Sequence, residues 1–181
     1  MQIILLGFLI RISLAIIDVN FFALPGGEFD AFSFNRVAIE FSNHLKSGGS
    51  LEDFNYIFGW IYSIFIGYVY YFFGESNLLG SFLSCFTWLL SALVLRNVMY
   101  KLYYPKQIIN IALIIYSFIF PTSIIFTSLM LREAYLLFFS NLLFLIIVNF
   151  YFSKNFNMKI FHLFFFILTS YILSVFHKAG G

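Results

Sequence analysis

Residues 78–100 read LLGSFLSCFTWLLSALVLRNVMY, a long apolar run whose single charged residue, Arg96, lies near its end. A helix needs about 20 mostly apolar residues to cross the hydrocarbon core of a bilayer, so this run predicts a membrane-spanning helix. Further apolar runs of the same kind occupy residues 3–20, 107–130, 134–152 and 160–176. Together they predict an all-α fold, a polytopic membrane helix bundle of about five spans in a single transmembrane domain over residues 1–181.

The composition excludes other classes of protein. The chain of 181 residues is 62% hydrophobic and only 10% charged, with a formal net charge of +2 and a mean hydropathy of +0.95. A soluble domain is about 45–50% apolar and about 25% charged, so a soluble globule is excluded, as is disorder. Because the chain has no basic cluster, we expect no nucleic acid partner. The single cysteine, Cys85, excludes a disulfide within the chain and a cysteine-based metal site.

The positions of lysine and arginine predict how the chain is oriented. They gather in two short connections, around residues 96–106 and 154–159. Short loops rich in these residues face the cytoplasm, so the connection at residues 132–133 is expected on the opposite side. Two arrangements fit equally well. With the N-terminus inside, the tyrosine-rich residues 56–73 stay at the membrane surface and the chain has five spans; with the N-terminus outside, they cross and it has six.

Residues 21–77 form the predicted outer loop, and the acidic residues gather in and beside it. Six of the eight acids lie within residues 18–55: Asp18, Glu28, Asp30, Glu40, Glu52 and Asp53. Apolar residues at helical spacing predict an amphipathic helix within the loop: Phe34, Val37, Ala38, Phe41 and Leu45. We expect Asp30 or Ser33 to cap the start of this helix and Gly48 to end it. Its apolar face is expected to lie among the lipid head groups.

Asp30 permits two interpretations. It stands in GGEFDAFSF (residues 26–34), and as a helix cap it would contribute about 0.5–2 kcal/mol, with Glu28 merely solvated. Alternatively, a carboxylate held at the membrane surface beside a tight turn acts as general base on an acceptor hydroxyl. Paired acids also bind divalent cations through oxygen ligands, and Mg²⁺ or Mn²⁺ would then be held by Asp30 and Glu133.

Other charged residues at the predicted membrane faces are candidate substrate ligands. Glu133, in a first helical turn, is favoured by the helix dipole, and Arg132 either suits bidentate recognition of a lipid phosphate or extends to the membrane surface. Arg11 inside an apolar run is costly in hydrocarbon, so it either reaches the surface or pairs with a carboxylate of another helix. The remaining candidates for substrate binding are Arg36, His177 and Lys178, the last two of which are equally explained as membrane anchors.

The order of these features resembles the N-terminal part of the GT-C class of membrane glycosyltransferases, which includes protein O-mannosyltransferases and lipid A aminoarabinose transferases. The likeness rests on LIRI (9–12), GGEFDAFSFNRVA (26–38), YIFGWIYSIFIGYVYYFFGESNLLGSFLS (56–84) and FPTSIIFTSLMLREAYLLF (120–138). The resemblance implies interfacial juxtamembrane helices in the first outer loop. It also implies that Asp30, with Glu28 nearby, is the base, that Glu133 is a second acid, and that Arg132 faces the donor phosphate.

The resemblance therefore implies a glycosyltransferase of the bacterial polysaccharide-associated type. Its partners would be the lipid bilayer, a polyprenyl-phosphate-linked sugar donor, and a glycan, lipid or protein acceptor. We expect it in the bacterial inner membrane with its active face outward. Because members of this class are several hundred residues long, the chain is expected to be the N-terminal module of a longer protein. The alternatives are a polysaccharide polymerase or ligase acting on lipid-linked glycans, a transporter or flippase, and a non-catalytic membrane fragment.

Overall fold

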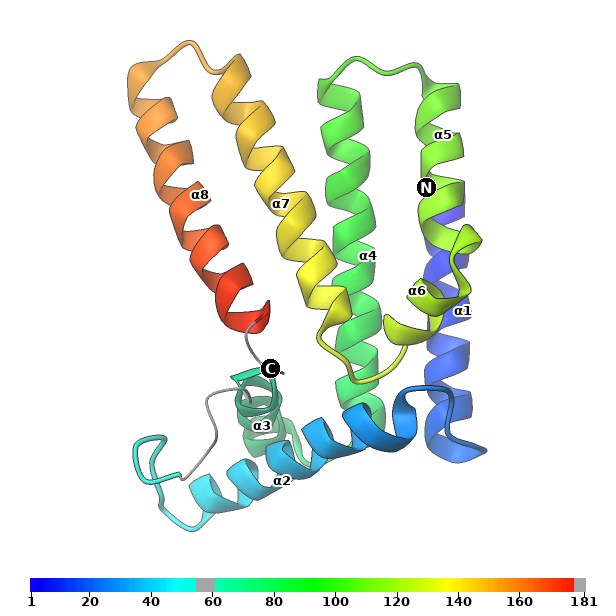
Figure 1. Ribbon diagram of the computed structural model, residues 1–181, viewed down its shortest axis with the longest axis vertical. Helices are drawn as coiled ribbons and strands as arrows, with labels where there is room; N and C mark the ends of the chain where they lie inside the picture. Colours follow the sequence, from blue (N-terminus) through cyan, green and yellow to red (C-terminus); the bar gives the residue numbers. More distant parts are fainter. Residues whose placement is uncertain (55–60, 178–181) are drawn as a thin grey trace.

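The computed structural model describes residues 1–54 and 61–177, and the regular structure within these ranges is helical throughout (Figure 1). Among the helices described, four are long and apolar enough to cross a membrane: α1 (Gln2–Asn20), α4 (Asn77–Lys101), α7 (Glu133–Phe152) and α8 (Phe156–His177). They coincide closely with four of the predicted spans. The protein is therefore an all-α integral membrane protein, as its composition predicted.

The long helices stand side by side (Figure 1). α4 packs against both α1 and α7, and α7 packs in turn against α8. The connection from α4 to α5 (Lys106–Ile114) and the connection from α7 to α8 lie at the same end of the bundle, whereas α7 begins toward the opposite end (Figure 1). Both basic connections are thus on one side, in agreement with the predicted topology.

The remaining predicted span, residues 107–130, is not one continuous helix. The expectation of an unbroken helix there is wrong. α5 continues into η2 (Ile115–Ile119), a single π-helical turn. Phe120 is then extended (φ −103°, ψ 97°), and the short helix α6 (Pro121–Phe126) follows. Pro121 causes the break, because it has no N–H to donate and its ring disfavours a helical conformation in the residue before it.

An amphipathic helix occupies the first loop, as predicted. It is α2 (Phe32–Lys46), which follows directly from the π-helical turn η1 (Gly27–Ala31) and lies across the end of the bundle (Figure 1). Its predicted apolar face packs against α3 (Ile61–Phe73). There the ring of Phe34 meets that of Tyr62 edge-on, with centroids 5.2 Å apart. The prediction that this face lies among lipid head groups is therefore wrong, because α3 covers it.

The predicted capping of α2 is confirmed at only one end. Gly48 follows the end of the helix with φ 90°, as expected. At the start, neither Asp30 nor Ser33 forms a capping hydrogen bond with any residue that the structure describes. The chain enters α2 from η1 with a helical backbone at Ala31 (φ −63°, ψ −40°), so the first N–H groups of α2 find acceptors within η1 and need no side-chain cap.

α3 is a short helix of 13 described residues. At about 1.5 Å per residue it is about 20 Å long, less than the roughly 30 Å of a hydrocarbon core. Part of the predicted stretch at residues 56–73 lies outside the described residues. The choice between five and six spans therefore stays a prediction.

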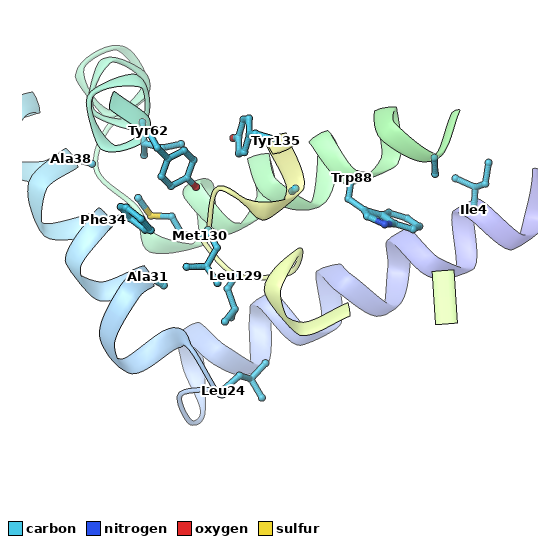
Figure 2. Packing of buried hydrophobic residues seen from close by; sticks show 14 of the residues in the cluster. Ile4, Leu24, Ala31, Phe34, Ala38, Tyr62, Trp88, Leu129, Met130 and Tyr135 are labelled. Carbon is cyan, nitrogen blue, oxygen red and sulfur yellow. The ribbon is translucent and has the colours of Figure 1, made fainter. Parts of the chain in front are cut away.

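The buried core is one cluster that extends from the middle of the bundle to the end that carries α2. In the middle of the bundle, Trp88 of α4 is fully buried and faces α1 (Figure 2). Toward the end that carries α2, residues of three helices meet the segment that follows α6: Phe34, Tyr62, Tyr135, Leu129 and Met130 (Figure 2). Residues 129–131 of that segment are at most 3% exposed. The non-helical connection is thus itself part of the core, and it fixes where α7 begins.

Candidate functional site

Two acids of the predicted site come together although they lie far apart in the sequence. Asp30 lies in η1, after the turn that follows α1, and Glu133 is the first residue of α7. The two carboxylates form no hydrogen bond with each other, and the electrostatic influence of Asp30 on Glu133 is weaker than that of burial. Asp30 is exposed, whereas the Oε2 atom of Glu133 is buried without a hydrogen-bond partner among the described residues. One exposed acid beside one shielded acid is an arrangement suited to proton transfer.

A small polar pocket adjoins η1. Its volume is about 140 Å³, and it opens between the end of α1, the start of α2 and the start of α4. Its polar lining consists of Asp18, Asn35, Asn77 and Ser81. Ala31, the residue after Asp30, forms part of the wall. Carboxylate, amide and hydroxyl groups in one pocket are suited to binding a ligand that carries several hydroxyl groups.

Asn35 holds three helices together at this pocket. Its Nδ2 atom donates a hydrogen bond to Oδ1 of Asn77 at 2.6 Å, which joins α2 to α4. Its Oδ1 atom accepts a hydrogen bond from the Tyr70 hydroxyl of α3 at 2.8 Å. In this bond the Tyr70 hydroxyl is the donor, and it is buried. The network fixes the pocket wall before any ligand arrives.

Asp18, at the end of α1, is the carboxylate inside the pocket. Its Oδ1 atom accepts a hydrogen bond from the backbone N–H of Leu24 at 2.7 Å, which closes the turn after α1. A Cβ on Gly27 would lie only 2.6 Å from the same oxygen, so any larger residue there would displace the Asp18 carboxylate. The sequence points to Asp18 only as one of the loop acids. Its place at a helix end, shortly before a Gly-Gly turn, is the signal that could have found it.

Arg132 lies next to Glu133 and links two helices. Its Nη1 atom donates to the backbone carbonyl of His177 at 3.4 Å. His177 is the last residue of α8, where unpaired carbonyl groups carry partial negative charge. The guanidinium group forms no other hydrogen bond with the described residues, so its remaining N–H groups stay available to a ligand at the start of α7.

The other predicted ligands do not join this group. Arg36 lies on the exposed face of α2, where its Nε atom is 3.8 Å from Oε1 of Glu40. Glu28 is exposed on η1, and the ring of His177 is exposed at the end of α8. Lys178 lies outside the described residues. A substrate role for these residues stays a prediction.

Arg11 is fully buried inside the bundle, in neither of the environments predicted for it. It does not reach the membrane surface, and no carboxylate among the described residues pairs with it. Instead, its Nε atom donates to Oγ1 of Thr127 at 2.8 Å. Its guanidinium carbon lies 3.6 Å from the centre of the Trp88 ring.

The remaining hydrogen bonds of Arg11 explain its position. Its Nη1 atom donates to the carbonyl oxygens of Gly7 at 3.0 Å and Ser117 at 3.3 Å. Ser117 lies in η2, where the helix is about to end and its carbonyl groups lose their partners within the helix. The positive charge of Arg11 therefore lies beside the carbonyl groups at the break, and its hydrogen bonds join α1 to the broken helix.

The described residues do not form a complete metal site around the predicted ligands Asp30 and Glu133. Among the described residues, no group of three His, Cys, Asp or Glu side chains is placed to hold a metal ion. Asp30 and Glu133 supply two carboxylates, which suits Mg²⁺ where substrate phosphate and water complete the coordination shell.

No protein-family model, curated protein or solved structure matches this chain. The functional conclusion therefore depends on the site itself, which combines two acids, a polar pocket and an arginine at one end of a membrane helix bundle.

Proposed function

We propose that the protein is a membrane glycosyltransferase of the GT-C type, which transfers a sugar from a polyprenyl-phosphate carrier to a hydroxyl acceptor. One observation carries the proposal: the polar pocket lined by Asp18, Asn35 and Asn77 opens at the end of the bundle where Asp30 and Glu133, from distant parts of the chain, both lie (Figure 1). A lipid-linked sugar requires apolar helices beside its chain and polar groups around its sugar. This end of the molecule supplies both.

In this proposal, the end that carries Asp30 and Glu133 faces away from the cytoplasm of a bacterial cell. α2 and α3 are juxtamembrane helices at that face. The chain crosses the inner membrane five times, with α5, η2 and α6 forming a broken crossing.

Asp30 acts as the general base of the proposed reaction. Its exposed carboxylate takes the proton of the acceptor hydroxyl while the hydroxyl oxygen bonds to the anomeric carbon of the sugar. On the opposite face, the bond from that carbon to the phosphate oxygen breaks, and polyprenyl phosphate leaves with the electron pair. The anomeric configuration is therefore inverted.

Arg132 and Glu133 assist this step. The guanidinium group of Arg132 stabilises the negative charge on the departing phosphate, and the carboxylate of Glu133 orients the acceptor. Asp18, Asn35 and Asn77 hold the hydroxyl groups of the sugar in the polar pocket. A divalent ion held by the carboxylates of Asp30 and Glu133 would supply further electrostatic stabilisation of the phosphate.

Asp30→Asn tests the proposal, because it keeps the size of the side chain and removes the base. We expect transfer to fall by about a hundredfold or more, while the amount of protein in the membrane stays unchanged. The assay follows radiolabelled sugar from polyprenyl-phosphate hexoses and pentoses into glycan, lipid and protein fractions of membranes that contain the full chain. The matched control is Glu40→Gln, which neutralises a different exposed acid, on α2 and outside the proposed site. Transfer at the wild-type rate by Asp30→Asn would remove Asp30 from the mechanism.

A transporter or flippase is the second candidate, because α5, η2 and α6 form a discontinuous helix with a buried arginine at its break. Transporters build binding sites from such helices near the middle of the membrane. The two functions predict different results in proteoliposomes. A flippase moves the lipid-linked sugar across the bilayer with its phosphate bond intact, whereas the glycosyltransferase releases free polyprenyl phosphate.

A further inference from the structure

The end of the bundle opposite the acids contains an open cavity of about 870 Å³. It lies between the last turn of α4 and the connection from α7 to α8. Its lining includes Lys101, Asn149, Lys154 and His162, with Tyr103 and Phe152 among the aromatic residues. The cavity shares no residue with the polar pocket described above, and the proposed transfer reaction does not use it.

The charge around this cavity is of one sign. The two segments that build this end, residues 96–106 and 149–162, contain basic residues and no acid: Arg96, Lys101, Lys106, Lys154 and Lys159. Lys101 donates a hydrogen bond to Oδ1 of Asn149, which joins α4 to α7 and keeps the ammonium group at the cavity wall. Lys154 forms no hydrogen bond or ion pair with any described residue. Most of the donors of these two ammonium groups therefore remain for an anionic ligand.

The wall of the cavity is partly aromatic. Tyr103 is 83% exposed and has φ 60°, a left-handed conformation that bulky residues rarely adopt. Its ring meets that of Phe152 edge-on, with centroids 6.1 Å apart. Phe152 and Met158, at the facing ends of α7 and α8, are also exposed. Aromatic residues beside a cationic cavity match the boundary between lipid head groups and acyl chains.

We propose that this cavity binds the head group of an anionic phospholipid. The phosphate lies between Lys101 and Lys154, and the glycerol and first acyl carbons contact Tyr103 and Phe152. Basic pockets between helices on the side of the positive loops are suited to such head groups. The aromatic wall and the adjoining apolar helices α7 and α8 favour a lipid over soluble phosphate as the occupant.

The test compares two charge-removing variants of the full chain, purified in detergent and incubated with equal parts of phosphatidylglycerol and phosphatidylcholine. Native mass spectrometry then counts the lipid that stays bound. We expect wild-type protein to retain phosphatidylglycerol in preference to phosphatidylcholine. Lys101→Gln with Lys154→Gln should weaken this retention by roughly tenfold. Lys106→Gln with Lys159→Gln removes the same charge at the same end but outside the cavity, and should retain the lipid as wild type does.

A single substitution separates lipid binding from folding. Lys154→Gln alone, at a side chain with no partner among the described residues, should weaken retention without changing the circular dichroism spectrum, which separates binding from folding. Equal losses in the two double variants would overturn the proposal in favour of general surface charge. Equal retention of both lipids would also overturn it. Displacement of the lipid by millimolar inorganic phosphate would show that soluble phosphate is the occupant.

Discussion

The guanidinium carbon of Arg11 lies 3.6 Å from the centre of the Trp88 ring. The two side chains belong to α1 and α4, and both are fully buried. A cation–π contact contributes about 2 kcal/mol or more when both groups are away from water. Because Arg11 also binds Thr127 and the Ser117 carbonyl, it joins α1, α4 and the broken helix at one point.

Removing this side chain should therefore destabilise the whole bundle. We expect Arg11→Ala to lower the free energy of unfolding by about 2–5 kcal/mol, because it leaves a cavity and unpaired polar groups. Thermal unfolding in detergent, followed by circular dichroism, measures the change. Arg96→Ala is the matched control, since the guanidinium carbon of Arg96 lies 4.9 Å from the Tyr100 ring near the surface. Its loss should stay below about 1 kcal/mol, and equal losses would contradict the role of Arg11.

Gly27→Ala should damage the polar pocket. The added Cβ would lie 2.6 Å from Oδ1 of Asp18, so the carboxylate has to move. We expect this overpacking to lower the free energy of unfolding by about 1–3 kcal/mol. We also expect the rate of sugar transfer to fall, because the displaced carboxylate belongs to the pocket. Asp18→Asn separates the two effects, because its amide oxygen still accepts from Leu24 while the charge is gone. A transfer rate unchanged by either substitution would show that the pocket does not hold the donor.

The hydrogen bond between Tyr70 and Asn35 should be measurable as a coupling between the two residues. Tyr70→Phe leaves the Asn35 carbonyl oxygen unpaired and should cost about 1–3 kcal/mol. A double-mutant cycle with Asn35→Ala should give a coupling of at least about 0.5 kcal/mol. Tyr71→Phe removes the hydroxyl of the next, exposed tyrosine on α3 and should leave stability unchanged. Additive effects of the two main substitutions would contradict the network.

Cysteine labelling should place both acids on one side of the membrane. In a Cys85→Ser background, Asp30→Cys and Glu133→Cys should both react with an impermeant maleimide added outside intact spheroplasts. Reaction at position 133 should be slower, because Glu133 is partly buried. Lys154→Cys should react only after the membrane is opened. Labelling of positions 30 and 133 from opposite sides would exclude a shared site.

The long helices could be predicted from the sequence because apolar length alone determines them. Residues 78–100 differ from the bounds of α4 by one residue at each end. The apolar spacing in the first loop likewise located α2, because a helix that buries one face repeats its apolar residues with the helical period. These features depend on neighbouring residues only, so one sequence is sufficient to find them.

The site could be predicted only in part, because it depends on contacts between distant segments. Asp30 and Glu133 were identified by residue type and by their places at predicted membrane faces. Nothing in the sequence links Asn35 to Asn77, and an asparagine at a helix start is ordinarily taken as a cap. The break at Pro121 was not predicted, although its signal is local: the proline is followed by Thr122 and Ser123, which interrupt the apolar run.

The burial of Arg11 affects how the chain is made. α1 leaves the ribosome before α4 and α6, and an arginine near the middle of a helix opposes insertion by about 2.5–3.5 kcal/mol when it enters the lipid alone. Trp88, Thr127 and the Ser117 carbonyl, which accommodate the arginine, are synthesised much later. The contacts that accommodate the arginine therefore form only after α6 has been translated, so nascent chains that stop before Trp88 should hold α1 in the membrane less firmly than the full chain does, which extraction with alkaline carbonate would measure.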